Sequence, residues 1–431
     1  MNIVIIGSGI AAVTAAAELR KLHPGTELCI DMVSADTPPD YTRPRLPEVV
    51  AGTADPAALT IRKADWFAAR HITLHNPARA VRIDRAAKQV FVQKDSAEYG
   101  LSYDGLLIAA GAQANRPAVP QPGSPAFGSV FALRTMSDAL ALKAHLAPHT
   151  ESAVIVGGGL LGIEAARAVK HAGVRRVHVI ETAPRMLPRQ LDERGSELLS
   201  AYLEQTGLIV HTGQAPDLKR LETERAAEVF RAVCADDGIE TVLYSVGVRP
   251  DTALAADCGL ACARGIIVND AMQTSDAAVY AAGDCAEFNG VCWGIVPSAL
   301  EQASAAARMM LYALYGGAEP ARYVQTVPSA MLRVGEREAV SGGKAVLTPE
   351  EIGSGRYALV HREAAAGAET EKSAALYAKA VIDLQAGTVA GGLVFGTQGA
   401  AAACARRLAP LIGRPEADAS VFLEELIPNA V

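Results

Sequence analysis

A glycine-rich turn occurs twice in this chain, and it constrains the fold more than any other feature. The first copy runs from Ile3 to Ala12 (IVIIGSGIAA) and the second from Val154 to Gly162 (VIVGGGLLG). Each copy follows a short apolar run and opens a helix-like stretch. A buried strand, a tight glycine turn and a helix in this order begin a βαβ unit that binds a dinucleotide, so the sequence predicts two such units.

The spacing of the glycines carries a physical argument. The first glycine permits the tight turn, the second lets the backbone approach a pyrophosphate, and the third position packs the helix on the strand. The phosphates then lie on unpaired N–H groups at the helix N-terminus. In a chain with 38 glycines one match could arise by chance, but two matches in the same context favour function. The positions concerned are Gly7, Gly9 and Ala12 in the first copy, and Gly157, Gly159 and Gly162 in the second.

An acidic residue at the end of the second strand of each unit is expected to bind ribose hydroxyls. Glu181 holds this place in the second unit, and its charge favours NADH because it repels a 2′-phosphate. Arg185, shortly after it, could weaken that preference, and two more arginines precede the strand. The first unit offers two alternatives, Asp31 within the strand and Asp36 at its edge, of which we favour Asp36.

The length of 431 residues predicts two to three domains. We expect an α/β fold with two Rossmann-like domains and a small α+β domain at the C-terminus. The first domain is discontinuous, with residues 1–115 and 245–318, and the second, 116–244, is inserted into it; the third is 321–431. We expect a loop over 37–47, strands at 28–34, 80–83, 89–92, 106–108, 242–246, 279–284, 377–383 and 389–395, and helices at 11–22, 298–314 and 399–412.

Composition excludes several function classes. The net charge of −7 argues against nucleic acid as a partner. No apolar stretch reaches the ~20 residues of a membrane span, and glycines interrupt the apolar N-terminus too early for a signal peptide, so we expect a cytoplasmic protein. The seven cysteines form no CxxC pair, and no metal-ligand spacing occurs. His178, inside an apolar strand, is assigned a structural role.

Further motifs resemble a known family. Ala109–Ala112, Ser245–Pro250 and Ala281–Asp284 resemble the segments that join and complete the domains of two-dinucleotide flavoprotein reductases of the glutathione-reductase type, over residues 1–320. Tyr41-Thr-Arg43-Pro-Arg-Leu46 and Leu133–Ala139 are similar to segments of rubredoxin–NAD reductases and flavorubredoxin reductases. Ala286–Gly290 also resembles the flavin module of assimilatory nitrite reductases.

The resemblance implies two cofactors, FAD and NADH, and assigns residues to each. Glu164 would reach the junction of flavin and nicotinamide as the catalytic residue, and Asp284 would bind the ribitol of FAD. The other FAD-binding residues implied are Gly7, Gly9, Ile10, Ala11, Ala12, Ala35, Asp36, Arg43, Val81 and Val296. NADH would be held by Gly157, Gly159, Leu161, Gly162 and Glu181, and Arg134 and Gly247 would complete the cofactor sites.

Residues 37–60 contain no cysteine, whereas disulfide reductases of this family carry a cysteine pair on the helix after the first ribose acid. Electrons are therefore expected to leave the flavin directly for a small external redox protein such as rubredoxin. Two alternatives stay open: a flavin module of a nitrite reductase or diaphorase with another acceptor, and an NADH-responsive sensor or scaffold.

Two further features have alternative interpretations. Pro47-Glu48 departs from close relatives; Glu48 either approaches Glu164, raising one carboxyl pKa, or is a solvated residue at a helix start. Arg406-Arg407 either forms a solvated helix face or helps to dock an acidic partner. In similar proteins the C-terminal domain serves dimerisation or partner docking, so a homodimer is one alternative.

Overall fold

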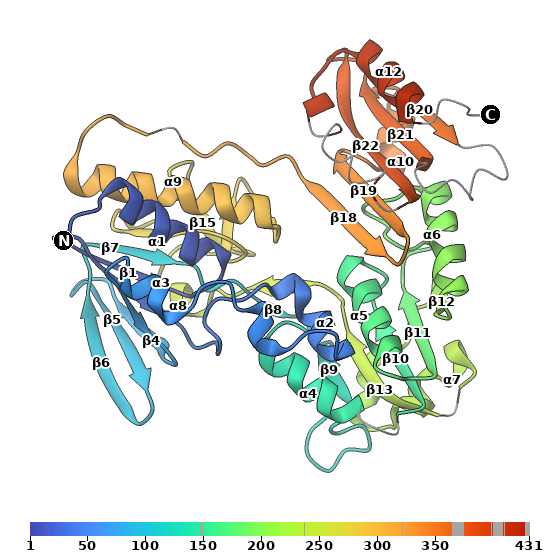
Figure 1. Cartoon of the computed structure of the whole chain (residues 1–431), viewed down its shortest axis with the longest axis horizontal. Coiled ribbons are helices and arrows are strands. Elements are labelled where there is room, and N and C mark those ends of the chain that lie inside the picture. The colour runs from blue at the N-terminus through green and yellow to red at the C-terminus, as the bar shows by residue number, and fades with distance from the viewer. Residues whose placement is uncertain are drawn as a thin grey trace. The chain divides into compact units, whose positions relative to one another are not determined.

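The computed structural model describes residues 1–146, 150–236, 238–320, 322–363, 375–397, 399, 408 and 410–426. These residues form two compact units, which are described separately. Unit 1 comprises Met1–Asn115, Arg134–Leu140 and Gly247–Thr326. Unit 2 comprises Arg116–Leu133, Ala141–Val246 and Val327–Val431. Each unit is therefore assembled from segments that are distant in the sequence (Figure 1).

Unit 1 is built on a parallel five-stranded sheet in the order β16-β7-β1-β2-β3. The strands are apolar and buried, as expected for a parallel sheet covered on both faces. They are Asn2–Ile6 (β1), Cys29–Val33 (β2), Ile72–His75 (β3), Gly105–Ile108 (β7) and Val279–Ala281 (β16). Strand β1 lies between β7 and β2, and in sheets of this kind a ligand binds at the carboxyl ends of the strands, where the strand order reverses.

Two helices pack together in unit 1, α1 (Ile10–Leu22) and α9 (Val296–Tyr315). Arg308 of α9 forms an ion pair with Glu18 of α1, with 2.8 Å between Nη2 and Oε1. Smaller elements complete the unit: strands Arg79–Asp84 (β4), Gln89–Lys94 (β5), Ala97–Ser102 (β6), Ala112–Ala114 (β8), Val248–Pro250 (β14), Ile266–Val268 (β15) and Ala286–Phe288 (β17), and helices Leu46–Ala51 (α2), Ala64–Ala68 (α3) and Ala253–Asp257 (α8).

The predicted loop over 37–47 is wrong at its end. A 3₁₀ turn forms at Arg43–Arg45, and α2 begins at Leu46. Pro47 occupies the first turn of α2, where a proline is tolerated because its missing N–H has no intrahelical partner. The proline therefore marks a helix start, not the end of a loop.

Unit 2 repeats the architecture. Its parallel sheet has the order β12-β11-β10-β13-β9. The strands are Val130–Ala132 (β9), Ser152–Val156 (β10), Arg176–Glu181 (β11), Ile209–Thr212 (β12) and Ile239–Tyr244 (β13), and the helices are Met136–Leu146 (α4, shared with unit 1), Leu160–His171 (α5), Glu193–Gln205 (α6) and Ala226–Cys234 (α7).

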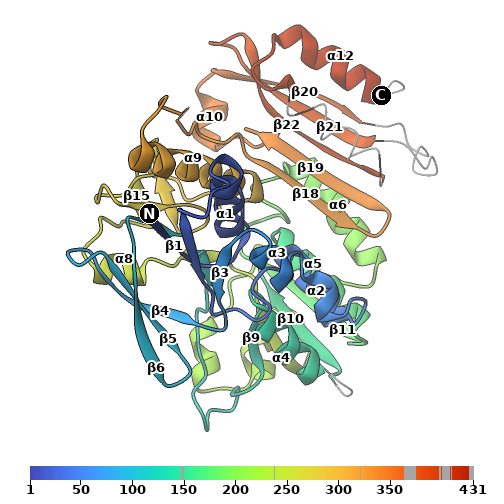
Figure 2. The ribbon, with the colours of Figure 1, turned by 60° about the vertical axis from the view of Figure 1, so that its left-hand side comes forward.

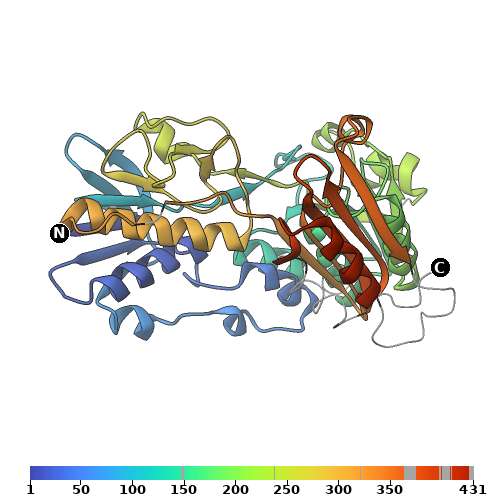
Figure 3. The same ribbon diagram turned by 90° about the horizontal axis from the view of Figure 1, so that it is seen from above.

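The C-terminal part of unit 2 is an antiparallel sheet in the order β18-β19-β22-β21-β20 (Figure 2). Helix α12 (Glu416–Leu426) lies across it (Figure 3). The remaining elements are Ser329–Val334 (β18), Arg337–Gly343 (β19), Pro349–Gly353 (α10), Tyr357–Glu363 (β20), Ala375–Asp383 (β21) and Thr388–Thr397 (β22). The expected helix 399–412 and the Arg406-Arg407 pair lie largely outside the described residues.

An ion pair between a buried lysine and a half-buried aspartate joins this sheet to the rest of unit 2. Lys379 of β21 lies 2.7 Å from the carboxylate of Asp192, which also accepts a hydrogen bond of 2.7 Å from the Tyr377 hydroxyl. Burial opposes ionisation of Asp192, but the bonds from Lys379, Gly195 and Tyr377 lower its pKa overall. The carboxylate is thus held in its charged form at the N-terminus of α6.

Candidate dinucleotide and electron-transfer site

The first glycine turn connects β1 to α1 in a geometry that only glycine adopts easily. Gly7 has φ +110°, and a Cβ at this position would lie 2.3 Å from the carbonyl oxygen of Ala109. Its N–H donates to the carbonyl of Val33 over 2.8 Å, which fixes the turn against the end of β2. The first glycine motif and the Ala109–Ala112 motif therefore meet at the carboxyl ends of neighbouring strands.

The N-terminus of α1 is open to an anion. Gly9 is its N-cap residue and supplies no capping side chain, and the first turn contains no acidic residue. Its leading N–H groups therefore lack the usual side-chain acceptor, and the helix dipole favours negative charge there. Arg43 adds a positive charge, since its Nη1 lies 2.9 Å from the place of a Gly9 Cβ. This set of donors fits a diphosphate.

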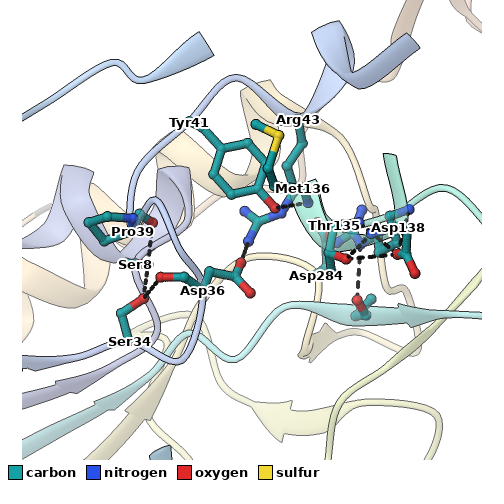
Figure 4. A network of polar contacts seen from close by, with 12 residues as sticks. Ser8, Ser34, Asp36, Pro39, Tyr41, Arg43, Thr135, Met136, Asp138 and Asp284 are labelled. Atoms are coloured by element: carbon teal, nitrogen blue, oxygen red, sulfur yellow. Dashed lines mark hydrogen bonds and ion pairs between the residues drawn. The ribbon is translucent and has the colours of Figure 1, made fainter. Parts of the chain in front are cut away.

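The loop after β2 presents a network of polar contacts (Figure 4). Asp36 forms an ion pair with Arg43, whose guanidinium lies 4.9 Å from the ring centre of Tyr41. The Tyr41 hydroxyl accepts a hydrogen bond of 3.2 Å from the Met136 backbone. Asn76 donates to the Asp36 carbonyl over 2.7 Å. The network holds Asp36 half-buried beside the glycine turn.

The structure separates the two candidate ribose acids of unit 1. Asp31 lies within β2, and its carboxylate is 2.8 Å from Nε2 of His75 on the adjacent strand. Asp36 lies beyond the end of β2, next to the residue Arg43 that overlies Gly9, with exposed Ala35 before it. Asp36 remains the predicted ribose acid, and Asp31 has a structural partner in His75.

A second ion pair in unit 1 joins segments that are distant in the sequence (Figure 4). Arg134 Nη2 lies 2.6 Å from Oδ2 of Asp284, which follows β16. Arg134 Nε also donates to the carbonyl of Ala112 over 3.0 Å. Asp138 fixes the backbone of Arg134 and Thr135 by accepting both N–H groups, at 3.1 and 2.9 Å. Three segments of the chain, which contain Ala112, Arg134 and Asp284, therefore meet at the Arg134 guanidinium.

Helix α9 begins close to the same strand end. Gln302 of α9 accepts the N–H of Gly283 over 2.9 Å, which positions the residue before Asp284. Val296 is the first residue of α9 and is 42% exposed. The α9 N-terminus has neither a capping side chain nor an acidic residue in its first turn. It is a second helix terminus in unit 1 that can take negative charge.

Val81 lies where the β4–β5 ladder is interrupted. The register shifts between Ala80 and Arg82, which leaves Val81 without a cross-strand partner. A bulge of this kind frees backbone donors and acceptors for other contacts. The role of the Val81 backbone in adenine binding remains a prediction.

The second glycine turn, in unit 2, matches the first in detail. Gly157 has φ +118°, and a Cβ there would lie 2.3 Å from the carbonyl oxygen of Ser245. At Gly162 a Cβ would come within 1.9 Å of the Gly157 carbonyl, so the third position requires glycine here, whereas Ala12 is accommodated in unit 1. The Ser245–Pro250 motif therefore meets the second turn as Ala109–Ala112 meets the first.

The N-terminus of α5 is also uncapped. Gly159 is its N-cap residue with no capping side chain, and no heavy atom lies within 4 Å of a Cβ built on it. Leu161 in the first turn is 50% exposed. The open space over Gly159 and the unpaired N–H groups of α5 fit a second diphosphate.

Glu181 is held beside this turn at the end of β11. Its carboxylate accepts the N–H groups of Gly158 and Ala183, each over 2.8 Å. Arg185, which the sequence offered as a residue that could weaken the preference for NADH, donates instead to the carbonyls of Leu191 and Pro188, at 3.2 and 3.4 Å. The charge beside the glycine turn is therefore that of the carboxylate.

Glu164 lies in α5 and has an unusual pKa. Burial raises the pKa of its carboxyl to about 7, against a smaller opposing effect of Arg167. Glu48 behaves in the opposite way: its carboxylate is bonded by Arg45, with 2.7 Å between Nη2 and Oε2, and its pKa is lowered. The rise at Glu164 thus comes from desolvation, and Glu48 is a paired residue in the first turn of α2.

The two segments that lead out of unit 1 and back into it pair with each other. Strands β8 and β14 run antiparallel, with Ala114 opposite Val248 and Ala112 opposite Pro250. Gly247, at φ +83°, accepts the N–H of Asn115 over 3.0 Å. The segment where the chain leaves unit 1 is therefore hydrogen-bonded to the segment where it returns.

The fold and the paired glycine turns define a class, which comparison with known proteins establishes. Residues 1–309 match the model of the pyridine nucleotide-disulphide oxidoreductase family, and the chain belongs to this family. The family uses FAD and NAD(H), the two cofactors that the sequence predicted.

Two relatives narrow the similarity. The chain is 32% identical over 352 residues to the assimilatory nitrate reductase electron transfer subunit of Bacillus subtilis, covering 80% of this chain and 42% of that protein. The chain thus spans less than half of that relative. It is also 32% identical over 344 residues to the NADH-rubredoxin oxidoreductase of Clostridium acetobutylicum, covering 79% of this chain and 81% of the relative.

A solved structure supports the same placement. NADH:rubredoxin oxidoreductase from Clostridium acetobutylicum matches with a TM-score of 0.71 and 26% identity, covering 96% of this chain and 95% of that one. The predicted fold of two Rossmann-like domains with a small C-terminal α+β part is confirmed. Among the described residues, no helix combines the length and apolar character needed to cross a membrane.

Proposed function

We propose that the protein is an NADH oxidoreductase that passes electrons through FAD to a small redox protein of the rubredoxin kind. The observation that carries the proposal is the pair of uncapped glycine turns, one in each unit, combined with the absence of cysteine from residues 37–60. The similarity to an NADH-rubredoxin oxidoreductase over most of both chains supports the same reading.

Unit 1 is proposed to hold FAD. The backbone of Gly7, Gly9, Ile10, Ala11 and Ala12 would cradle its diphosphate under Arg43. Ala35 and Asp36 would contact the ribose, and Val81 would contact the adenine. Asp284, together with Arg134, would bind the ribitol, and Val296 would lie against the flavin ring. Gly247 would support these contacts because its hydrogen bond with Asn115 holds the segment where the chain returns to unit 1.

The part of unit 2 that carries the second glycine turn is proposed to hold NADH. The diphosphate would lie over Gly159 and Leu161 at the N-terminus of α5, with Gly157 and Gly162 shaping the turn. Glu181 would accept hydroxyl hydrogens of the adenine ribose and repel the 2′-phosphate of NADPH. This arrangement favours NADH as the electron donor.

When bound, FAD supplies the ability to accept a hydride and to release electrons one at a time. The chain's own residues bind and orient the two cofactors, which lowers the entropic part of the barrier. Burial raises the pKa of the Glu164 carboxyl to about 7, so its protonated form is accessible near neutral pH. By gaining or losing this proton, Glu164 would change the charge of the proposed nicotinamide pocket.

The absence of a thiol relay favours an external redox protein over a disulfide as the acceptor. Disulfide reduction in this family needs cysteines on the helix that follows the ribose acid, and here Arg43–Arg45 and α2 contain none. An external one-electron carrier is therefore the better acceptor. The similarity to an electron transfer subunit of a nitrate reductase favours one second candidate, a flavin module that serves a nitrogen-oxide reductase.

An acceptor panel tests the proposal. Purified FAD-loaded protein is given NADH and, separately, rubredoxin, a [2Fe–2S] ferredoxin, glutathione disulfide or nitrite with a cognate reductase module. We expect the largest kcat/KM with rubredoxin and none above background with the disulfide. Preference for the reductase module would support the second candidate, and no turnover with any acceptor would support an NADH-responsive sensor or scaffold.

A further inference from the structure

Three potential metal ligands meet inside unit 2, and none of them belongs to the second glycine turn. They are His178 on β11, His211 on β12 and Cys234 at the end of α7. One nitrogen from each histidine and the cysteine sulfur all lie within 4.8 Å of one another. The Nδ1 atom of His178 is 3.0 Å from Nε2 of His211.

The fold places these side chains together without involving the cofactor residues. Strands β11 and β12 are parallel, with His178 beside Ile209 and Ile180 beside His211, so both histidines project from the same face of the sheet. Cys234 belongs to the apolar cluster on this face, together with Ile180 and Phe230. His178 and Cys234 are buried and His211 is half-buried, which gives solvent one approach.

A carboxylate orients His178. Asp236 accepts hydrogen bonds from Arg176 (2.7 Å), Ser152 (2.6 Å) and the Gly238 backbone (2.8 Å), and its Oδ2 lies 3.2 Å from Nε2 of His178. A carboxylate that receives so many donors acts as an acceptor, so Nε2 of His178 carries the proton and Nδ1 presents a lone pair to His211. Metal-binding histidines are commonly held by a carboxylate in this way.

The separation of the two imidazole nitrogens suits a small tetrahedral cation. Two nitrogens bound to Zn²⁺ at about 2.0–2.1 Å lie roughly 3.3 Å apart, close to the 3.0 Å between the imidazole nitrogens. Two imidazoles and a thiolate match the preference of zinc for nitrogen and sulfur ligands. With three protein ligands, a water molecule can take the fourth position.

We propose that His178, His211 and Cys234 bind one Zn²⁺ ion, with Cys234 releasing its thiol proton to solvent as the Zn–S bond forms. The ion would link β12 and the end of α7 to β11, the strand that ends in Glu181. Its role is to stabilise the dinucleotide-binding part of unit 2, and it does not depend on the identity of the electron acceptor.

The test measures zinc on tag-free, FAD-loaded protein after treatment with a chelator. Zn²⁺ is titrated in competition with a chromophoric chelator, and the zinc X-ray absorption spectrum reports its ligands. We expect one zinc per chain with one sulfur and two imidazoles, and a zinc-dependent rise in the thermal unfolding temperature.

Variants separate this site from adventitious binding. His211→Gln and Cys234→Ser should weaken zinc binding at least tenfold, whereas His361→Gln and Cys262→Ser, outside the cluster, should bind as the wild type does. Circular dichroism and FAD content show whether each variant folds. If wild-type protein binds no zinc, if its spectrum lacks a sulfur ligand, or if the cluster variants bind as tightly as the controls, the proposal is overturned.

Discussion

Gly157 and Gly159 belong to the same turn, yet their surroundings differ sharply. A Cβ at Gly157 meets the Ser245 carbonyl, while one at Gly159 meets nothing within 4 Å. Gly159→Val should therefore fold and retain FAD, but fill the space over the α5 N-terminus. We expect the dissociation constant for NADH to rise at least tenfold, about 1.4 kcal/mol, in a fluorescence titration. Unchanged NADH affinity would remove the second glycine turn from the proposed site.

Glu164 should make stability depend on pH. Its pKa is about 7 in the folded chain against 4.5 for an unperturbed carboxyl, so folding favours the protonated form. Stability is unaffected below pH 4.5 and is lost as the pH rises from 4.5 through 7. Glu164→Gln removes this cost, and we expect it to raise the free energy of unfolding at pH 8 by about 1–3 kcal/mol, with little effect at pH 4.5.

Urea unfolding at the two pH values measures this difference. Glu48→Gln is the matched control, because the pKa of Glu48 is lowered by Arg45 at a solvated position. The control should change stability by no more than about 0.5 kcal/mol. A pH-independent effect of Glu164→Gln would contradict a raised carboxyl pKa.

Glu181 should set the choice between NADH and NADPH. Glu181→Gln keeps an acceptor for the backbone N–H groups of Gly158 or Ala183 but removes the negative charge. We expect the ratio of kcat/KM for NADPH to that for NADH to rise about tenfold, roughly 1.4 kcal/mol of lost repulsion. Arg185→Ala should leave the ratio unchanged, since Arg185 is bonded to backbone carbonyls. An unaltered ratio in Glu181→Gln would place the ribose elsewhere.

At the scale of elements, local rules predicted some features and missed others. The glycine turns were predictable because a positive φ and a carbonyl 2.3 Å from the missing Cβ leave no alternative residue. Strand β6 was missed because its sequence AEYGLS has weak strand character and depends on pairing with β5. The start of α2 was expected too late, because Pro47 was interpreted as a loop residue and only Glu48 as a residue at a helix start.

The site shows the same division. Residues in the glycine motifs follow from sequence spacing, but Asn76 and Gln302 were not identified. Asn76 donates to the carbonyls of Ser34 and Asp36, and Gln302 accepts the N–H of Gly283; only the folded chain makes these contacts. His211 and Cys234 likewise approach His178 from separate elements, so the three residues form no short sequence motif that could have predicted the cluster.

The Arg134–Asp284 pair should matter for FAD more than for folding. Arg134→Ala removes a bond of 2.6 Å to the proposed ribitol ligand, and we expect the FAD dissociation constant to rise at least tenfold. Arg85→Ala is the matched control, since Arg85 pairs with Asp276 at 2.7 Å in the same unit. FAD content after gel filtration measures both variants. Equal retention of FAD in the two would remove Arg134 and Asp284 from the proposed site.

On the scale of the whole molecule, the two glycine turns have unequal roles in the proposal. The turn at Gly7 belongs to a unit that is completed by Asp284 and α9, far along the sequence, which suits a cofactor that stays bound. The turn at Gly157 has open space over Gly159, which suits a nucleotide that comes and goes. In the proposal, the absence of cysteine from 37–60 leaves an external carrier as the electron acceptor.

Anaerobic rapid mixing tests this account most directly, in two half-reactions on the same FAD-loaded protein. NADH is mixed first and flavin absorbance is followed; oxidised rubredoxin is then mixed with the reduced protein. We predict fast bleaching by NADH, slower bleaching by NADPH, and reoxidation by rubredoxin at least as fast as steady-state turnover. Flavin that is bleached by NADH but not reoxidised by rubredoxin on the turnover timescale would contradict the proposed transfer to a small redox protein.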